Sequence, residues 1–172
     1  LAIFAAVYLG FARTFFLRPW FTEYAATRAP PEPFFYLHGA VFAAWFVLLV
    51  VQPALVGAGR TDLHRALGRI GAAVAAAVVV TGVAGALIAA RRPGGFMGIP
   101  VPPAEFLLVP LTDLTLFAVF VSLAIVRRGD AQSHKRLMIV GSLCLLDAAI
   151  ARWPIVVDLG NPLVFFALTD LF

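Results

Sequence analysis

This chain of 172 residues is too apolar to be a soluble domain. Hydrophobic residues make up 62% of it and charged residues 13%, with a mean hydropathy of +0.97, whereas a soluble domain is close to half apolar and a quarter charged. A net charge of +4 would suggest nucleic-acid binding in a soluble protein. Here the basic residues lie at the ends of apolar runs, where they meet lipid headgroups. The composition therefore predicts an integral membrane protein whose partner is the lipid bilayer, and it argues against nucleic acid as a partner.

The first apolar run predicts a membrane span over residues 1–17. The segment that follows, residues 18–33, contains three prolines close to its end. Proline cannot continue a helix, and it also restricts the residue before it. This segment is therefore predicted to be an extended connection.

Residues 34–92 carry the strongest pattern, that of a helical hairpin. Neither Asp, Glu, Lys nor Arg occurs between Glu32 and Arg60, or between Arg69 and Arg91. Each run exceeds the roughly 20 apolar residues that a helix needs to cross a bilayer. We therefore expect two antiparallel spans joined by a short basic turn over residues 60–69.

The second helix of this hairpin is rich in small residues spaced four apart, which lets neighbouring helices approach closely. The pairs are Gly71 and Ala75, Ala72 and Ala76, Gly82 and Ala86, and Gly85 and Ala89. This spacing predicts that the helix lies at the buried centre of a bundle.

The second half of the chain repeats the pattern of the first. Residues 105–126 predict a fourth span, residues 127–136 a second basic turn and residues 137–158 a fifth span, after which a sixth helix begins. Kinks are expected where a proline interrupts a span, at Pro53, Pro110 and Pro154. Because the sixth helix is too short to cross a bilayer, we expect either a longer protein or a partner that completes this end.

Two short repeats link these parts. A His followed by a basic residue precedes a new span in both turns, L-H-R-A-L-G-R and S-H-K-R-L-M-I, and the tetrapeptide L-T-D-L occurs twice. The predicted fold class is therefore all-α. We expect one polytopic transmembrane helical bundle over residues 1–172, with about five complete spans plus the start of a sixth, built from repeated helical hairpins.

The distribution of basic residues predicts the orientation. The two turns carry seven Lys and Arg residues, and the opposite loops carry four. By the positive-inside rule, the turns over residues 60–69 and 127–136 are expected to be cytoplasmic, in the inner membrane of a bacterium.

Ionisable residues inside the apolar runs suggest a polar site in the outer half of the membrane. These residues are His38, Asp113, Asp147, Arg152 and, if a sixth helix forms, Asp170. Such residues cost about 2.5–3.5 kcal/mol each on insertion scales, so they usually face a partner or a cavity. Arg152 is expected to pair with Asp113 or Asp170, and the whole group is either a functional pocket or a buried ion-pair network that fixes helix register.

His64 and His134 form a second candidate site. Both precede a span on the predicted cytoplasmic side, so they would meet if their helices are neighbours. Two facing histidines are what a b-type haem or a metal ion needs. The alternative is that both are interfacial residues that contact headgroups or cap helices.

The two basic turns resemble those of a group of bacterial multi-pass membrane proteins without an agreed activity. The resemblance covers residues 63–152 and rests on L-H-R-A-L-G-R-I and on R-R-G-D-x-x-x-H-K-R-L-M-I. That group is loosely similar to membrane factors for respiratory-oxidase assembly and to helical b-type cytochromes.

Three functions follow from these patterns. The leading interpretation is a non-enzymatic assembly factor or accessory subunit of a larger membrane complex, which would have other membrane subunits as partners. The alternative is a redox protein that binds haem b or a metal through His64 and His134. A small secondary transporter, with Asp113, Asp147 and Arg152 along its path, is the third.

Overall fold

The computed structural model describes residues 1–26, 30–93, 95–96, 101–153, 155–156 and 167, and every regular element in these residues is helical. The elements are α1 (Ala2–Phe11), the π-helix η1 (Ala12–Phe16), the 3₁₀-helix η2 (Arg18–Trp20), α2 (Thr22–Ala26), α3 (Pro33–Gly57), α4 (Thr61–Ala90), α5 (Pro103–Phe106), α6 (Leu108–Val126), α7 (Ala131–Leu143) and α8 (Asp147–Ile150). The predicted all-α class is confirmed.

Three of the predicted spans are helices long and apolar enough to cross a membrane. They are α3 with 25 residues, α4 with 30, and the stretch Pro103–Val126, formed by α5 and α6, with 24. Large apolar side chains stand exposed on their outer faces, among them Val80 at 68% and Leu108 at 67% of full exposure. Exposed apolar faces of this kind suit contact with lipid.

Most of each basic segment is helical. The turns predicted over residues 60–69 and 127–136 are therefore shorter than expected. In the first, α4 begins at Thr61, and only the residues around Gly59, with a φ of +72°, reverse the chain. In the second, α7 begins at Ala131. Arg, Lys, Leu, Ala and Gln are good helix formers, so the helices continue past the apolar runs.

Pro110 and the connection before α3 also differ from expectation. Pro110 lies in the first turn of α6, where no intrahelical N–H is needed, so it does not interrupt that helix. Pro53 lies inside α3, which continues to Gly57. The segment 18–33 contains η2 and α2 and is therefore not wholly extended.

The predicted fifth span is not one continuous helix. α7 ends at Leu143, and α8 begins only at Asp147. The hydroxyl of Ser142 and the thiol of Cys144 bond the carbonyls four residues back, at Met138 and Val140. Such bonds compete with the helical ladder and bend helices. The last turn then tightens through i→i−3 bonds, such as that from Leu146 N to Leu143 O at 2.9 Å.

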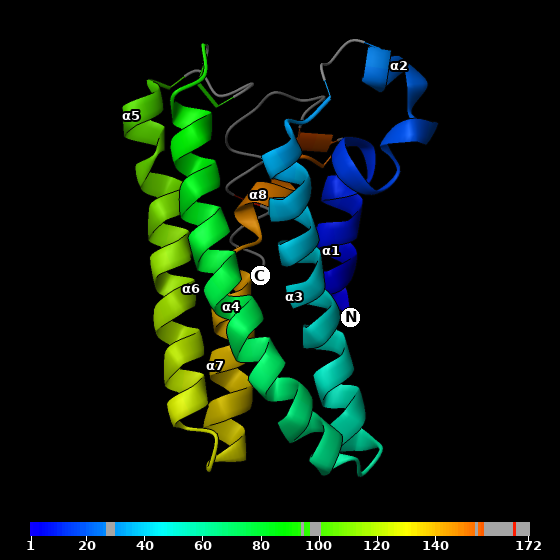
Figure 1. The fold of residues 1–172 in the computed structure, drawn as a ribbon, viewed down its shortest axis with the longest axis vertical. Helices are drawn as coiled ribbons and strands as arrows, with labels where there is room; N and C mark the ends of the chain where they lie inside the picture. Colours follow the sequence, from blue (N-terminus) through cyan, green and yellow to red (C-terminus); the bar gives the residue numbers. More distant parts are fainter. Residues whose placement is uncertain (27–29, 94, 97–100, 154, 157–166, 168–172) are drawn as a thin grey trace.

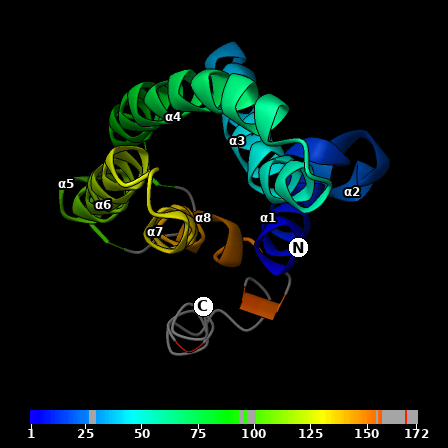
Figure 2. The ribbon, with the colours of Figure 1, turned by 90° about the horizontal axis from the view of Figure 1, so that it is seen from below.

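The helices form a single bundle. α3 and α4 are an antiparallel pair, α4 packs against α6, and α6 and α7 form a second antiparallel pair (Figure 1). Viewed from below, α4 arches between α3 and α6, while α7 and α8 lie on the other side, between α6 and α1 (Figure 2). Both basic segments lie at the lower end in Figure 1, on the same side as the sequence predicts.

Trp45 lies at the centre of the bundle and joins three helices. Its ring on α3 packs edge-on against Phe117 of α6, with the centroids 5.0 Å apart. Its indole N–H donates to the hydroxyl of Ser142 on α7 at 3.2 Å, and that hydroxyl donates to Met138 O at 2.8 Å. Trp45 is 2% exposed and Ser142 0%. The buried indole N–H and the buried Ser142 hydroxyl therefore both have partners.

The glycines predicted to allow close packing do so at several helix contacts. In α4, Leu114 of α6 packs directly over Gly82, and His38 and Phe34 of α3 pack over Gly85. In α1, a Cβ on Gly10 would overlap the backbone of Ala149 in α8. α4 thus packs closely against α3 and α6, but it lies along one side of the bundle (Figure 2) and not at its buried centre as predicted.

The Trp45–Ser142 bond gives a stability prediction. Ser142→Ala leaves the buried indole N–H without its acceptor, which should cost about 1–3 kcal/mol of unfolding free energy. In a Trp45→Phe background the same change should cost clearly less, because no donor is left unpaired. SDS titration of the detergent-solubilised chain measures both. Thr115→Ala is the control, since that hydroxyl bonds only its own helix; additive losses from Ser142→Ala and Trp45→Phe would contradict the prediction.

Candidate functional site

Two carboxylates from different helices lie near enough to each other to interact electrostatically around the break between α7 and α8. Asp113 is in the first half of α6, and Asp147 is the first residue of α8. Their charges are close enough to interact, and both also act on the Cys144 thiol within the break. The predicted site residues Asp113 and Asp147 are thus near each other in the fold, and the Cys144 thiol adds a polar atom to the break.

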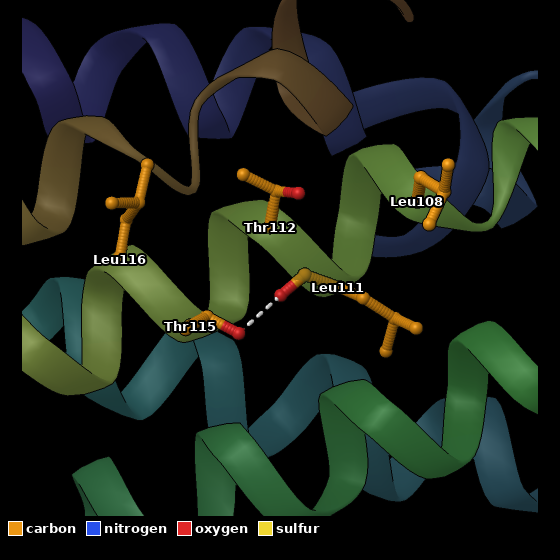
Figure 3. Close-up of a pocket in the computed structure, with 5 residues that line it drawn as sticks. All are labelled: Leu108, Leu111, Thr112, Thr115 and Leu116. Carbon is orange, nitrogen blue, oxygen red and sulfur yellow. Dashed lines mark hydrogen bonds between the residues drawn. The ribbon is translucent and has the colours of Figure 1, made fainter.

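A pocket of about 220 Å³ lies along the first half of α6 (Figure 3). Its walls are Leu108, Leu111, Thr112, Thr115 and Leu116. The side chains of Thr112 and Leu116 point towards the chain between α7 and α8, while Thr115 donates to Leu111 O at 2.7 Å (Figure 3). The pocket therefore lies along the same turns of α6 as Asp113, which is itself not among the lining residues.

His38 is held against α4 and does not join the carboxylates in an ion pair. Its Nδ1 donates to Thr81 O at 3.2 Å, and its ring packs 4.3 Å from that of Phe42. The carbonyl can only accept, so the proton is on Nδ1. Arg152 is close enough to act on His38 electrostatically.

Arg152 does not make the predicted ion pair with Asp113. Its guanidinium donates to Ala148 O, one turn back, and lies over the ring of Phe11 with Cζ 4.8 Å from the centroid. α8 is docked on α1, where Trp153 Nε1 donates to Ala6 O at 3.0 Å, so Arg152 faces the aromatic side of α1. Asp170, the other predicted partner, lies outside the described residues.

His64 and His134 meet at the lower end of the bundle, as expected for neighbouring helices. Their ring centroids are 6.3 Å apart, and the ring planes stand at 85°. Nδ1 of His134 donates to Ala124 O, the C-terminal part of α6, at 2.8 Å. This bond places the His134 proton on Nδ1 and leaves Nε2 with a free lone pair.

Gln52 of α3 fixes the other histidine. Its amide nitrogen donates to His64 Nδ1 at 2.6 Å and to His64 O at 3.3 Å, and its oxygen accepts from Gly68 N at 3.1 Å. His64 therefore carries its proton on Nε2. The two rings are complementary, because one offers an N–H and the other a lone pair.

The sequence analysis missed Trp45, Gln52 and Ser142, which organise these sites. A usable signal was present for Trp45, because a tryptophan in the middle of a span lies away from the interfacial belts and needs an acceptor for its N–H. Gln52 is likewise a polar residue near the end of an apolar helix. Neither signal identifies the hydrogen-bond partner, because that partner lies on another helix.

The fold defines a helical protein with three candidate membrane-spanning helices. Comparisons with protein-family models, with curated proteins and with solved structures found no match. Within the residues described, no group of three or more His, Cys, Asp or Glu side chains could hold a metal ion.

Asp130 fixes the start of α7, and thereby the position of His134, in a pH-dependent way. Its carboxylate accepts from Ser133 Oγ at 2.5 Å, Gln132 N at 3.0 Å and Ser133 N at 3.3 Å. The Ser133 hydroxyl, then the two N–H groups and the charge of Arg127, hold the pKa of Asp130 below its usual value.

A carboxyl whose pKa is lowered by folding stabilises the fold above its unfolded-state pKa and loses that contribution as the pH falls through the folded-state value. Asp130→Ala should therefore lower the thermal midpoint at pH 7, and its difference from the wild type should shrink below about pH 4. Asp130→Asn keeps a capping oxygen and should be less damaging. Thermal unfolding of the detergent-solubilised chain across this pH range checks both variants. A difference that stays constant down to low pH would contradict a role for the charge.

Proposed function

We propose that this protein is a small cation-coupled membrane carrier, with Asp113 and Asp147 as its proton- and cation-binding groups. The observation that carries the proposal is a helix break, between α7 and α8, at which carboxylates from two different helices are near enough to influence each other electrostatically. Discontinuous helices with ionisable residues near the middle of the membrane are typical of binding sites in secondary transporters.

Electrostatics explains why such a pair would bind a cation. Two carboxylates side by side repel each other, and the low dielectric of a membrane interior strengthens the repulsion. A shared proton or a bound cation relieves it. Backbone carbonyls at the break, where the helical ladder is interrupted, would supply further oxygen atoms of the kind that hard cations prefer.

The proposal includes a topology. We place the basic end, with the starts of α4 and α7, in the cytoplasm of a bacterium and the carboxylates in the opposite half of the inner membrane. In this arrangement α1–η1 and α7–α8 complete a five-span bundle around the three long helices. The expected accessory role in a larger complex stays a prediction, because an exposed apolar face suits lipid and protein neighbours equally.

Cation–proton exchange in proteoliposomes tests the carrier. With a pH-sensitive dye inside, an imposed Na⁺ or K⁺ gradient should change the internal pH, because the carboxylates would exchange a proton for the cation. Asp113→Asn and Asp147→Asn should each reduce the rate of this cation–proton exchange by about tenfold or more. Either variant leaves a single carboxylate, so the repulsion between two charges that favours cation binding is lost.

Glu105→Gln is the matched control, because this carboxylate lies exposed near the beginning of the same apolar stretch. It should leave the exchange rate unchanged. Gel filtration verifies that each variant stays folded. The proposal fails if the wild type exchanges neither cation for protons, or if Asp113→Asn exchanges them at the wild-type rate.

A second candidate, a haem- or metal-binding redox protein, is favoured by the distance between His64 and His134. A metal ion on the line between two imidazole nitrogens, with bonds of about 2.0 Å, places the ring centres about 6 Å apart, and the observed spacing is 6.3 Å. Haem supplies four ligands of its own, so two histidines complete its coordination. Ligation by both Nε2 atoms would require the Gln52 amide to turn over, so that its oxygen accepts from His64 Nδ1.

An absorption spectrum of the protein purified from its native membrane separates the two candidates. Bound haem b should give a Soret band that disappears in His64→Ala and in His134→Ala, because each ring supplies one axial ligand. His38→Ala should retain the band, since that ring lies at the other end of the bundle. A colourless wild-type protein, or a Soret band that persists in both variants, would contradict this candidate.

A further inference from the structure

A second pocket, of about 390 Å³, lies between α6 and α7 at the basic end of the bundle. Arg127 and Leu123 line it from α6, one turn apart, and Ser133, Arg136 and Leu137 line it from α7. The carboxylates and the histidine pair discussed above are not among these residues. The pocket thus has its own composition of two guanidinium groups, one hydroxyl and two leucines.

These five residues are arranged from polar to apolar along the bundle. Arg127 follows the last residue of α6, at the water-facing end, while Leu123 lies one turn further into the apolar helix. On α7, Ser133 and Arg136 precede Leu137 in the same direction. A ligand with an anionic group at the rim and hydrocarbon below it would match this order.

The charge around the pocket is strongly positive. Arg127, Arg128, Lys135 and Arg136 lie in the connecting segment and the first turns of α7, against one acidic residue, Asp130. The carboxylate of Asp130 is occupied by the Ser133 hydroxyl and by two N–H groups of the same helix end. The Ser133 hydroxyl already donates its proton to Asp130, so towards a ligand its oxygen can only accept a hydrogen bond. The two guanidinium groups are therefore the hydrogen-bond donors that the pocket offers to an anion.

From this arrangement we infer that the pocket binds one anionic phospholipid, with the phosphodiester between Arg127 and Arg136 and an acyl chain along Leu123 and Leu137. Guanidinium groups hold phosphate oxygens through paired, charge-assisted hydrogen bonds. Basic pockets between membrane helices at the cytoplasmic side suit such headgroups. The inference is independent of the proposed transport, because it depends only on this end lying at a membrane–water interface.

Native mass spectrometry of the full chain in a mild detergent tests the site. Dioleoyl phosphatidylglycerol, added in increasing amounts, should bind with a first site at least about tenfold tighter than dioleoyl phosphatidylcholine, whose headgroup adds a positive charge. The double variant Arg127→Gln/Arg136→Gln should lose this preference. Thermal unfolding verifies that the variant remains folded.

The matched control is Arg65→Gln/Arg69→Gln, which removes the same charge from the same end of the bundle and also from exposed positions, but on α4 and outside the pocket lining. It should retain the preference for phosphatidylglycerol. If both double variants lose the preference equally, the attraction is a diffuse surface effect and the inference is overturned.

Two further ligands separate a lipid from a free anion. Glycerophosphoglycerol has the same headgroup without acyl chains, and inorganic phosphate has the anion alone. Neither should displace bound phosphatidylglycerol at concentrations up to 100-fold above it, because the apolar wall would stay empty. If either one displaces the lipid at an equal concentration, the pocket is a site for a soluble phosphate and the lipid assignment is wrong.

Discussion

The contact between Trp45 and Ser142 sets the arrangement on which the rest of the bundle depends. A polar group within a membrane has no water to satisfy it, so a buried indole N–H and a buried hydroxyl need each other. Their bond spans 97 residues of sequence and ties α3 to α7, while the Trp45 ring also packs on α6. The same hydroxyl bonds back to Met138, at the end of α7, just before that helix breaks. The central contact and the helix break therefore share a residue.

The break has consequences at both of its ends. Because α7 stops at Leu143, Asp147 begins a new short helix that leaves the line of α7 and docks against α1. The close approach of Gly10 to Ala149 and the bond from Trp153 to Ala6 hold that short helix in place. This placement turns Asp147 towards Asp113 and Arg152 towards Phe11. The proximity of the two carboxylates and the separation of Arg152 from Asp113 both follow from the docking of α8 against α1.

The opposite end of the bundle has a different character. There the helices run past the apolar stretches into basic sequence, and each polar group is held by a partner near it. Gln52 orients His64, the end of α6 orients His134, and Asp130 caps α7. A rigid basic end with paired histidines and an arginine-lined pocket is suited to the interface between lipid headgroups and water, whereas the carboxylates lie deeper in the bundle.

The sequence by itself determined the class of protein, the three long apolar helices, the common side of the two basic segments and the close packing of α4 through its glycines. These follow from composition, apolar run length and small-residue spacing, which are local properties. His64 and His134 could be grouped from sequence because each is followed by a basic residue and precedes an apolar run in one of the two basic segments. Only the tertiary structure decided that the fifth apolar run breaks after Leu143, and that Arg152 bonds Ala148 and packs on Phe11 instead of pairing with Asp113. Hydropathy measures how apolar a segment is, but not which neighbour satisfies each polar group, and that neighbour lies on another helix.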